Sequence, residues 1–302
     1  MDTAHLELLR ELHDRGSLAA VARVTGRTPS AVSQQLRTAE RDLGVTLVER
    51  AGRGLRLTAA GELLAEAAVG VAAELARVQA RLDDLVSVPS GQVRLAALPS
   101  AAVVLVPPLL ARLAATRVTL TLDDIDVSER GFPALADDAD VVIGHSMSGP
   151  VPAGAERLAC VPLLREPLDI ALPRGHRLAG AATLQAADLA GEDWIGVPEG
   201  FPFDAVRLDI ERRLSQPMRV VQRVRDNAVV EALVAAGQGV ALLPRFSTRP
   251  SAAIVLRPLA DVPSSRFVVA MCRPERAERA AVRVVLEALR AVAGRIAGDG
   301  SS

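Results

Sequence analysis

The sequence predicts a multidomain chain of mixed α+β and α/β class, with a small winged helix-turn-helix domain, one long helix and a larger α/β region. Three observations predict this fold. Three short amphipathic segments and two β-rich runs occupy residues 1–58. Residues 59–86 contain no proline and carry apolar side chains at helical spacing. Beyond residue 91, strand-like runs alternate with helical patterns, which favours layered α/β structure.

Composition excludes several classes of protein. Half of the 302 residues are hydrophobic, which argues against disorder. The net charge is −1, yet residues 23–57 hold seven arginines against three acidic residues, which is a local basic patch. The longest uncharged run, between Arg94 and Arg112, contains three prolines, and no apolar leader opens the chain. We therefore expect a cytoplasmic protein without a membrane span.

The first two helices have the features of a helix-turn-helix pair. Residues 5–14 carry four leucines in an amphipathic pattern, and residues 18–24 form a second helix of mostly small side chains after Gly16-Ser17. Small side chains let two helices approach closely, as this motif requires.

The third helix, residues 28–43, is the centre of the N-terminal domain. Thr28 can cap it, and Pro29 suits its first turn. Apolar residues recur every three or four positions from Val32 to Leu43, which predicts a buried face. The other face offers groups that can read base edges, although a solvated surface helix would carry similar groups. These polar residues are Ser30, Ser33, Gln34, Arg37 and Arg41.

A β-hairpin is predicted to follow the three helices. Residues 45–50 and 55–57 are short β runs joined by a Gly-x-Gly turn, which places Arg53 at the tip. Three helices and a hairpin describe a winged helix. In such a domain the third helix enters the major groove, and an arginine of the wing reaches phosphate or the minor groove.

These residues resemble the LysR-type transcriptional regulators. The resemblance rests on Gly16–Ala22, on Ala31–Leu36 and on positions between Glu40 and Gly61, among them Leu43-Gly44-Val45 and Leu57-Thr58. It extends without gaps over about forty-five residues. It implies that residues 1–58 form a DNA-binding domain.

The same region departs from the family's usual pattern in three places. Ala39 and Val48 are smaller than the family's usual residues, which suggests a smaller core between wing and helix. Thr28-Pro29-Ser30 replaces the usual Ser-Gln-Pro and alters groups expected to contact bases. The expected DNA-binding residues are Ser17, Thr28, Ser30, Ser33, Gln34, Arg37, Arg50 and Arg53.

Residues 59–90 are expected to form a dimerisation helix and a hinge. Thr58 can cap the helix, and Val88–Gly91 would end it. Its apolar residues are spaced alternately by four and three, a narrow seam that favours a second helix as partner. The resemblance supports a homodimer or homotetramer, and packing on the chain's own C-terminal domain is the alternative. The seam comprises Leu64, Ala68, Val71, Leu75, Val78, Leu82 and Leu85, all except Ala68 being expected dimer contacts.

Residues 91–302 are expected to form a ligand-binding domain. Its segment Glu231–Pro244 resembles the family's effector domain, which is similar to periplasmic binding proteins. The resemblance implies two α/β lobes, one of about 91–163 plus 266–297 and one of about 164–265. Strands are predicted at 92–98, 117–122, 140–144, 194–197, 219–224, 240–243 and 266–272, with two strands separated by a break in 158–172. Helices are predicted at 101–115, 229–236 and 275–297.

Candidate effector contacts follow the strands of this region, because ligands bind beyond the carboxyl ends of strands in open α/β sheets. Ser100 follows the first strand and can cap the next helix, whose N–H groups would then face an anion. Each candidate also fits an ordinary cap or turn, and the charge of the effector stays open. The expected effector-binding residues are Ser100, Ala101, His145, Ser146, Gly200, Phe201 and Asn227.

A hydrolase is the alternative from another class. Residues 141–149 resemble the nucleophile elbow of α/β-hydrolases, in which Ser146 would be the nucleophile and His176 the only downstream histidine. Ser148 replaces the final glycine, and two prolines follow where a helix must begin. We therefore expect a protein that is not an enzyme.

Metal and redox chemistry receive little support from the sequence. Four histidines and two cysteines are scattered, so neither a metal site nor a cofactor is expected. Cys160 and Cys272 lie in apolar runs typical of buried, unreactive thiols, and a redox pair is the alternative.

The expected function is that of a LysR-type, sequence-specific regulator. Its binding to double-stranded DNA, or its activation of a promoter, would respond to a small-molecule effector. The resemblance further implies a partly palindromic DNA site and contact with RNA polymerase.

Overall fold

The computed structural model describes residues 2–51, 54–86, 88–248 and 251–299. The chain divides into two compact units, Met1–Ser87 with Pro274–Arg279, and Val88–Arg273 with Ala280–Ser302. Each unit is described by itself. Among the described residues, no helix is both long and apolar enough to cross a membrane.

The first unit begins with the three predicted helices, which local signals delimit. The side chains of Asp2, Ser17 and Thr28 each accept a backbone N–H in the first turn of the helix that follows. A glycine in the left-handed conformation ends each helix, at Gly16, Gly26 and Gly44. The helices are α1 (Thr3–Arg15), α2 (Leu18–Thr25) and α3 (Pro29–Leu43).

The predicted hairpin is also present, as β1 (Val48–Ala51) paired with antiparallel β2 (Gly54–Leu57). Glu40 of α3 holds its start, because the Glu40 carboxylate accepts the Leu47 N–H at 2.9 Å. The buried residues Val32, Leu36 and Ala39 of α3 belong to the core of this domain. The tip residue Arg53 lies outside the described residues.

The long helix α4 (Ala59–Val86) follows the hairpin and is capped by Thr58, whose Oγ1 accepts the Gly61 N–H at 3.2 Å. Gly61 lets α4 pass close to the hairpin, since a Cβ there would lie 2.3 Å from the Leu47 carbonyl oxygen. Helix α9 (Pro274–Ala277) also belongs to this unit.

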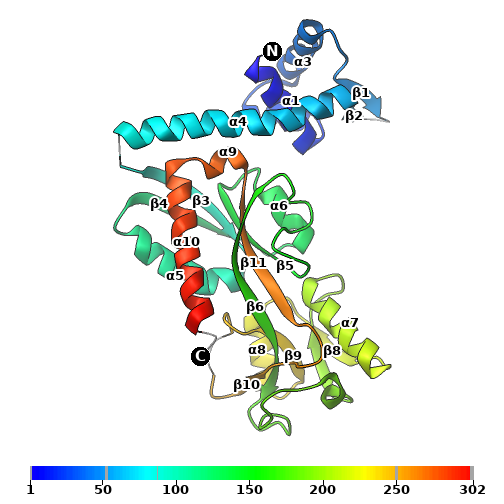
Figure 1. Cartoon of the computed structure of the whole chain (residues 1–302). Coiled ribbons are helices and arrows are strands. Elements are labelled where there is room, and N and C mark those ends of the chain that lie inside the picture. Colours follow the sequence, from blue (N-terminus) through cyan, green and yellow to red (C-terminus); the bar gives the residue numbers. More distant parts are fainter. Residues whose placement is uncertain (1, 52–53, 87, 249–250, 300–302) are drawn as a thin grey trace. The chain divides into compact units, whose positions relative to one another are not determined.

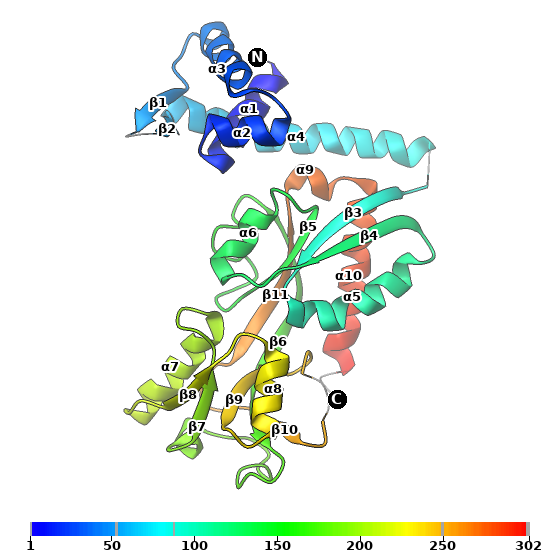
Figure 2. The same cartoon turned by 180° about the vertical axis from the view of Figure 1, so that it is seen from behind.

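The second unit is built on one mixed sheet (Figures 1 and 2). The strand order among described residues is β4-β3-β5-β11-β6-β9-β7-β8, and β10 pairs with β6. Strands β3, β4 and β5 form a first lobe, and β7, β8 and β9 a second, while the long strands β6 and β11 connect them. The strands are β3 (Ser90–Ala97), β4 (Arg117–Asp124), β5 (Val141–Ser146), β6 (Ala159–Pro173), β7 (Asp193–Gly196), β8 (Arg219–Arg223), β9 (Val240–Pro244), β10 (Ile254–Arg257) and β11 (Ser265–Cys272).

Helices cover both lobes. Helices α5 (Pro99–Leu113) and α10 (Ala280–Asp299) pack on each other and on strands of the first lobe, with the short η1 (Glu129–Gly131) and α6 (Phe132–Leu135) beside β5. In the second lobe, α7 (Pro202–Leu214) packs on β7 and on η2 (Ala186–Leu189), and α8 (Asn227–Ala235) packs on β9. The division expected near residues 163 and 265 falls within β6 and at the start of β11.

Several expectations for this unit were wrong. Strand β6 is continuous, whereas a break was expected. Its Ala159–Pro167 part pairs with β11 alone. Alternate backbone N–H groups there make no hydrogen bond to a neighbouring strand, so proline, which lacks an N–H, is tolerated at those positions. The closing helix is divided into α9 and α10, and α7 and β10 were not predicted. The other predicted strands and helices are confirmed to within a few residues.

Candidate nucleic-acid interface and ligand site

Helix α3 presents a polar face to solvent. Ser30, Gln34 and Arg37 are exposed, and Ser33 is half-buried. Arg37 donates from Nη1 to Ser33 Oγ at 2.9 Å, which joins the two side chains on this face. Hydroxyl, amide and guanidinium groups are therefore available together on one helix, as base recognition requires.

Two of the predicted contact residues have a local structural role. Ser17 Oγ accepts the Ala20 N–H at 3.2 Å, and Thr28 Oγ1 accepts the Ala31 N–H at 3.2 Å. The hydroxyl groups of Thr28 and Ser30 are 2.9 Å apart, so the cap also positions Ser30. Capping uses only an acceptor site of each hydroxyl, so the Ser17 hydroxyl proton and one proton of the Thr28–Ser30 pair stay available for a phosphate.

The hairpin carries the remaining arginines. Arg50 is exposed on β1, and its guanidinium has no hydrogen bond or ion pair with the described residues. Arg56 on β2 forms an ion pair with Glu49. Free guanidinium groups on such a hairpin can bind phosphate.

The residues of the predicted seam on α4 differ in exposure: those near its start are buried or packed on the core, and those further along are exposed. Ala68 is buried, and Leu64 packs against the core of its own domain, so Leu64 is not free for a partner helix. Four seam residues expose between about two-fifths and three-fifths of their surface, and the side chain of Leu85 falls outside the described part. The exposed four are Val71, Leu75, Val78 and Leu82.

A buried polar cluster lies where the two long strands meet the first lobe. Arg266 of β11 and Glu166 of β6 are 1% and 2% exposed and form an ion pair, with Arg266 Nε and Nη2 donating to Glu166 Oε2 at 2.8 and 2.6 Å. Arg266 Nη2 also donates to Ser100 Oγ at 3.0 Å. Glu166 Oε1 accepts the N–H groups of Phe246 and Ser247 at 2.9 and 3.0 Å. We call these residues the inter-lobe cluster: Ser100, Glu166, Phe246, Ser247 and Arg266.

The expectation that Ser100 caps the next helix is wrong. Helix α5 begins at Pro99, whose fixed backbone angle suits the first helical position, and Leu98 is the N-cap residue without a side-chain hydrogen bond. Ser100 therefore lies within the first turn. Ala101 follows it, is buried, and donates its N–H to the Leu98 carbonyl at 3.1 Å.

His145 and Ser146 are buried at the end of β5. The His145 ring lies edge-on to Phe132 at 5.6 Å and to Phe203 at 6.1 Å between ring centroids, and its Nδ1 has no partner. Burial, followed by the nearby Arg266 charge, lowers the pKa of His145 from 6.5 to about 3. His145 is therefore neutral at physiological pH.

The other predicted contacts lie on the second lobe. Gly200 is exposed in a left-handed turn with φ of 80°, and Phe201 precedes α7. The Arg225 guanidinium lies 5.7 Å from the centroid of the Phe201 ring and 4.0 Å from the Asp126 carboxylate of the first lobe. Asn227 lines a cavity of about 10 Å³, room for about one water molecule.

Phe203 of the second lobe contacts both His145 of the first lobe and Arg266 of the inter-lobe cluster. Its ring contacts His145 of the first lobe and the Arg266 guanidinium at 5.7 Å. Sequence reasoning missed Phe203, Glu166 and Arg266. For Arg266 the available signal was a single charged residue in an otherwise apolar strand, whereas Glu166 lies on a strand that also carries Arg165 and Asp169.

Among the described residues, Ser146 and His176 are not arranged as the nucleophile and base of a hydrolase. No helix follows Ser146; its Oγ lies 3.1 Å from Ser148 Oγ, while the imidazole of His176 contacts Glu192 at 3.1 Å. Across the part of the chain that the structure describes, no group of three or more His, Cys, Asp or Glu residues could hold a metal ion.

Comparison with known proteins places this geometry in a family. Residues 3–62 match "Bacterial regulatory helix-turn-helix protein, lysR family", and residues 87–294 match "LysR substrate binding domain". The chain is 25% identical to transcriptional dual regulator GltC of Bacillus subtilis over 284 residues, 93% of each chain. It is 29% identical to a probable hydrogen peroxide-inducible genes activator of Streptomyces viridosporus over 274 residues, 89% of this chain and 86% of that protein.

A solved structure shows the same fold. Full-length OxyR from Pseudomonas aeruginosa, in a variant form, matches with a TM-score of 0.59 and 20% identity over 96% of this chain and 98% of that one.

Proposed function

This chain belongs to the LysR family of bacterial transcriptional regulators, and from that premise we propose that it controls promoters as a homodimer or a homotetramer whose action on DNA responds to a small-molecule effector. The chain has both the DNA-binding and the effector-binding domain of the family. It is a regulator and not an enzyme. We place it in the cytoplasm with its DNA target.

DNA recognition is assigned to the polar face of α3 and to the hairpin. Exposed Ser30, Gln34 and Arg37 offer the donors and acceptors that distinguish base pairs in the major groove. The free Arg50 and, from the sequence, Arg53 supply charge for the phosphate backbone. Ser17 and Thr28 cap the N-termini of α2 and α3, which we propose face the phosphate backbone of the DNA.

The observation that carries the effector response is the inter-lobe cluster. Ser100 belongs to the first lobe, Phe246 and Ser247 belong to the second, and the Arg266–Glu166 pair on the connecting strands is bonded to both. A ligand that bonds to Ser100 or to the unpartnered His145 Nδ1 would compete with these bonds or add to them. It would thereby change the balance between lobe arrangements.

The exposed seam on α4 supports the dimer. Val71, Leu75, Val78 and Leu82 repeat at the spacing of a coiled-coil seam, and a row of exposed apolar residues on one helix favours a second helix as partner. Pairing would set two copies of α3 at a fixed separation, which matches a partly palindromic DNA site. Contact with RNA polymerase is proposed from family membership alone.

The effector is proposed to bind without covalent chemistry. The curated relative in Streptomyces viridosporus is named for induction by hydrogen peroxide. In this chain the two cysteines are Cys160, whose pKa burial raises, and the fully buried Cys272. A thiol that reacts with peroxide is accessible and has a low pKa, whereas the pKa of Cys160 is raised and Cys272 is inaccessible.

The proposal is tested on the full-length chain in two steps. DNA fragments from its own genome are first selected by binding, and a thermal-shift screen of small metabolites then finds an effector. The affinity of that effector is next measured with and without the selected DNA. Reciprocity requires that each ligand change the affinity for the other by the same factor.

The two parts of the proposal fail separately. Selection of no sequence above random DNA would refute sequence-specific recognition. Equal effector affinity with and without the selected DNA would refute effector control of DNA binding. A Ser100→Ala variant is expected to weaken the effector and leave affinity for the selected DNA in its absence unchanged.

A further inference from the structure

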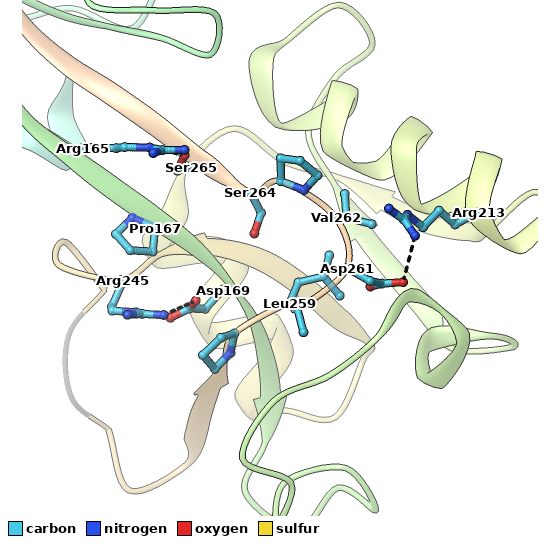
Figure 3. Close-up of a pocket in the computed structure, with 13 residues that line it drawn as sticks. Arg165, Pro167, Asp169, Arg213, Arg245, Leu259, Asp261, Val262, Ser264 and Ser265 are labelled. Atoms are coloured by element: carbon cyan, nitrogen blue, oxygen red, sulfur yellow. Dashed lines mark hydrogen bonds and ion pairs between the residues drawn. The ribbon is translucent and has the colours of Figure 1, made fainter. Parts of the chain in front are cut away.

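A pocket lies on the opposite face of the connecting strands from the inter-lobe cluster. It has a volume of about 560 Å³ and is bounded by β6, by residues 258–265 ahead of β11 and by the end of α7 (Figure 3). On β6 its lining residues are Arg165, Pro167 and Asp169, which alternate with Glu166 of the cluster. Successive side chains of a strand point to opposite faces, so the pocket and the cluster are separate sites.

The pocket gathers three guanidinium groups. Arg165 donates from Nε to Ser265 Oγ at 2.9 Å and lies 5.6 Å from the centroid of the Phe267 ring. Arg245 donates from Nε and Nη2 to Asp169 at 2.6 and 2.8 Å. Arg213 reaches the Asp261 carboxylate only at 3.8 Å. Within the described chain, the terminal nitrogens of Arg165 have no hydrogen bond, and those of Arg213 have only this long contact.

The two acidic residues of the pocket are already engaged. Asp169 is buried in its two-bond pair with Arg245, and that pair raises the pKa of Arg245. Asp261 Oδ1 accepts the Ala186 N–H at 2.9 Å. The pocket thus holds three arginines against two aspartates. The groups without a close partner are hydrogen-bond donors, namely guanidinium nitrogens of Arg165 and Arg213. Such a balance favours an anion.

The rest of the lining is apolar enough to hold a carbon skeleton. Leu259 and Val262 are buried behind the pocket, and Pro263 completes this wall. Arg165 and Arg213 lie on opposite sides of the lining, with the 258–265 segment between them (Figure 3). The volume is within the range of small-molecule sites, roughly 300–1,000 Å³.

We propose that this pocket binds a small organic anion with two acidic groups, one held by Arg165 and the other by Arg213. The carbon chain between them packs on Leu259 and Val262. Carboxylates and phosphate esters share this chemistry, because both accept paired hydrogen bonds from a guanidinium group. The site is additional to the effector site of the proposed function and does not depend on it.

The test is calorimetric titration of the full-length chain at constant ionic strength. The probes are succinate, glutarate and adipate, with pentanoate as the matched monoacid, 3-phosphoglycerate as the phosphate ester and sulfate as the simple ion. We expect one of the diacids or the phosphate ester to bind, and pentanoate and sulfate to bind at least about tenfold more weakly. Comparison of the diacids with 3-phosphoglycerate distinguishes a carboxylate ligand from a phosphate ligand.

Variants assign the binding to this pocket. Arg165→Gln and Arg213→Gln are each expected to raise the Kd about tenfold or more. Arg212→Gln is the matched control, because Arg212 is the neighbour of Arg213 on α7, pairs with Asp209 and does not line the pocket. Ser100→Ala, on the opposite face, should leave this affinity unchanged.

Three outcomes would overturn the proposal. They are the absence of binding by all diacids and the phosphate ester, equal binding of pentanoate, and an affinity that falls in Ser100→Ala but not in Arg165→Gln. The last would place the anion in the inter-lobe site. Since Arg165 and Arg213 are exposed at the surface, their variants are expected to fold, and far-ultraviolet circular dichroism checks this.

Discussion

Cys160 and Cys272 lie on adjacent strands and point to opposite faces of the sheet. In the antiparallel pairing of β6 with β11, Cys160 is opposite Met271, and Cys272 is opposite Ala159. Residues directly opposite share a face, and neighbours along a strand alternate, so the two thiols are separated by the sheet itself.

Oxidation should therefore not join these cysteines. We expect the full-length chain treated with diamide or hydrogen peroxide to show no intramolecular disulfide, because the thiols cannot meet without disrupting the sheet. Alkylation followed by mass spectrometry of the peptides measures this. A peptide pair linked through Cys160 and Cys272 would contradict the geometry, and a denatured sample serves as the positive control.

Removing one partner of the Arg266–Glu166 pair should be costly. Glu166→Gln leaves the Arg266 guanidinium, 1% exposed, without its counter-charge, and we expect a loss of about 3–5 kcal/mol in the free energy of unfolding. The fluorescence of Trp194, the only tryptophan and a buried residue of the same unit, follows urea unfolding. The double variant Glu166→Gln/Arg266→Met should lose less than Glu166→Gln alone. A larger loss in the double variant would show that the cost does not come from an unpaired charge.

Stability should fall in acid because of His145. Its pKa is about 3 when folded, against 6.5 in the unfolded chain, so between these values the unfolded state binds a proton that the folded state does not. Unfolding free energy is therefore expected to fall by about 1.4 kcal/mol per pH unit as pH drops from about 6 to about 4.

The variant His145→Gln isolates this contribution. Its plot of unfolding free energy against pH, again from Trp194 fluorescence, should be shallower by about the same amount per pH unit. Parallel plots for wild type and His145→Gln would contradict the lowered pKa.

Base reading and phosphate binding should separate by variant. Gln34→Ala or Arg37→Ala is expected to weaken binding to the selected DNA by roughly 1–3 kcal/mol while affinity for random DNA changes little. Arg53→Ala should weaken binding to both and lower the salt dependence by about one ion. Fluorescence anisotropy at several salt concentrations measures these effects. Equal losses of Gln34→Ala on selected and random DNA would remove Gln34 from base recognition.

Charge in the seam of α4 should break the dimer. Leu75→Glu places a carboxylate where the proposal puts two apolar helices together, so light scattering is expected to show half the mass of the wild-type assembly or less. Leu63→Glu is the matched control, because Leu63 is an exposed leucine of the same helix on another face. An unchanged mass for Leu75→Glu would assign dimerisation elsewhere.

Local signals explain which parts of the fold could be predicted from the sequence. The first three helices and the hairpin are set by caps, left-handed glycines and short apolar periods, all of which can be read within about fifteen residues. Strand β6 was predicted with a break because its tolerance of prolines depends on which neighbours it has in the sheet. Helix α7 begins at Pro202 after a Gly-Phe turn and is not among the predicted helices.

The site was less predictable for the same reason. Ser100, His145 and Ser146 follow strands, so a general rule for α/β sheets finds them. Glu166 and Arg266 are one hundred positions apart and meet only through the register of β6 with β11. A single sequence does not give that register, so it cannot reveal the cluster that bonds to both lobes.

The pairing of β5 with β11 has a consequence for synthesis. Strand β5 ends at Ser146, but its neighbour β11 begins only at Ser265, so the sheet of the first lobe cannot be completed until residues 265–272 have left the ribosome. The helix-turn-helix domain precedes this sheet in the chain and emerges before it, and domains fold as units during synthesis. A nascent chain would thus hold a folded DNA-binding domain well before its regulatory half is finished.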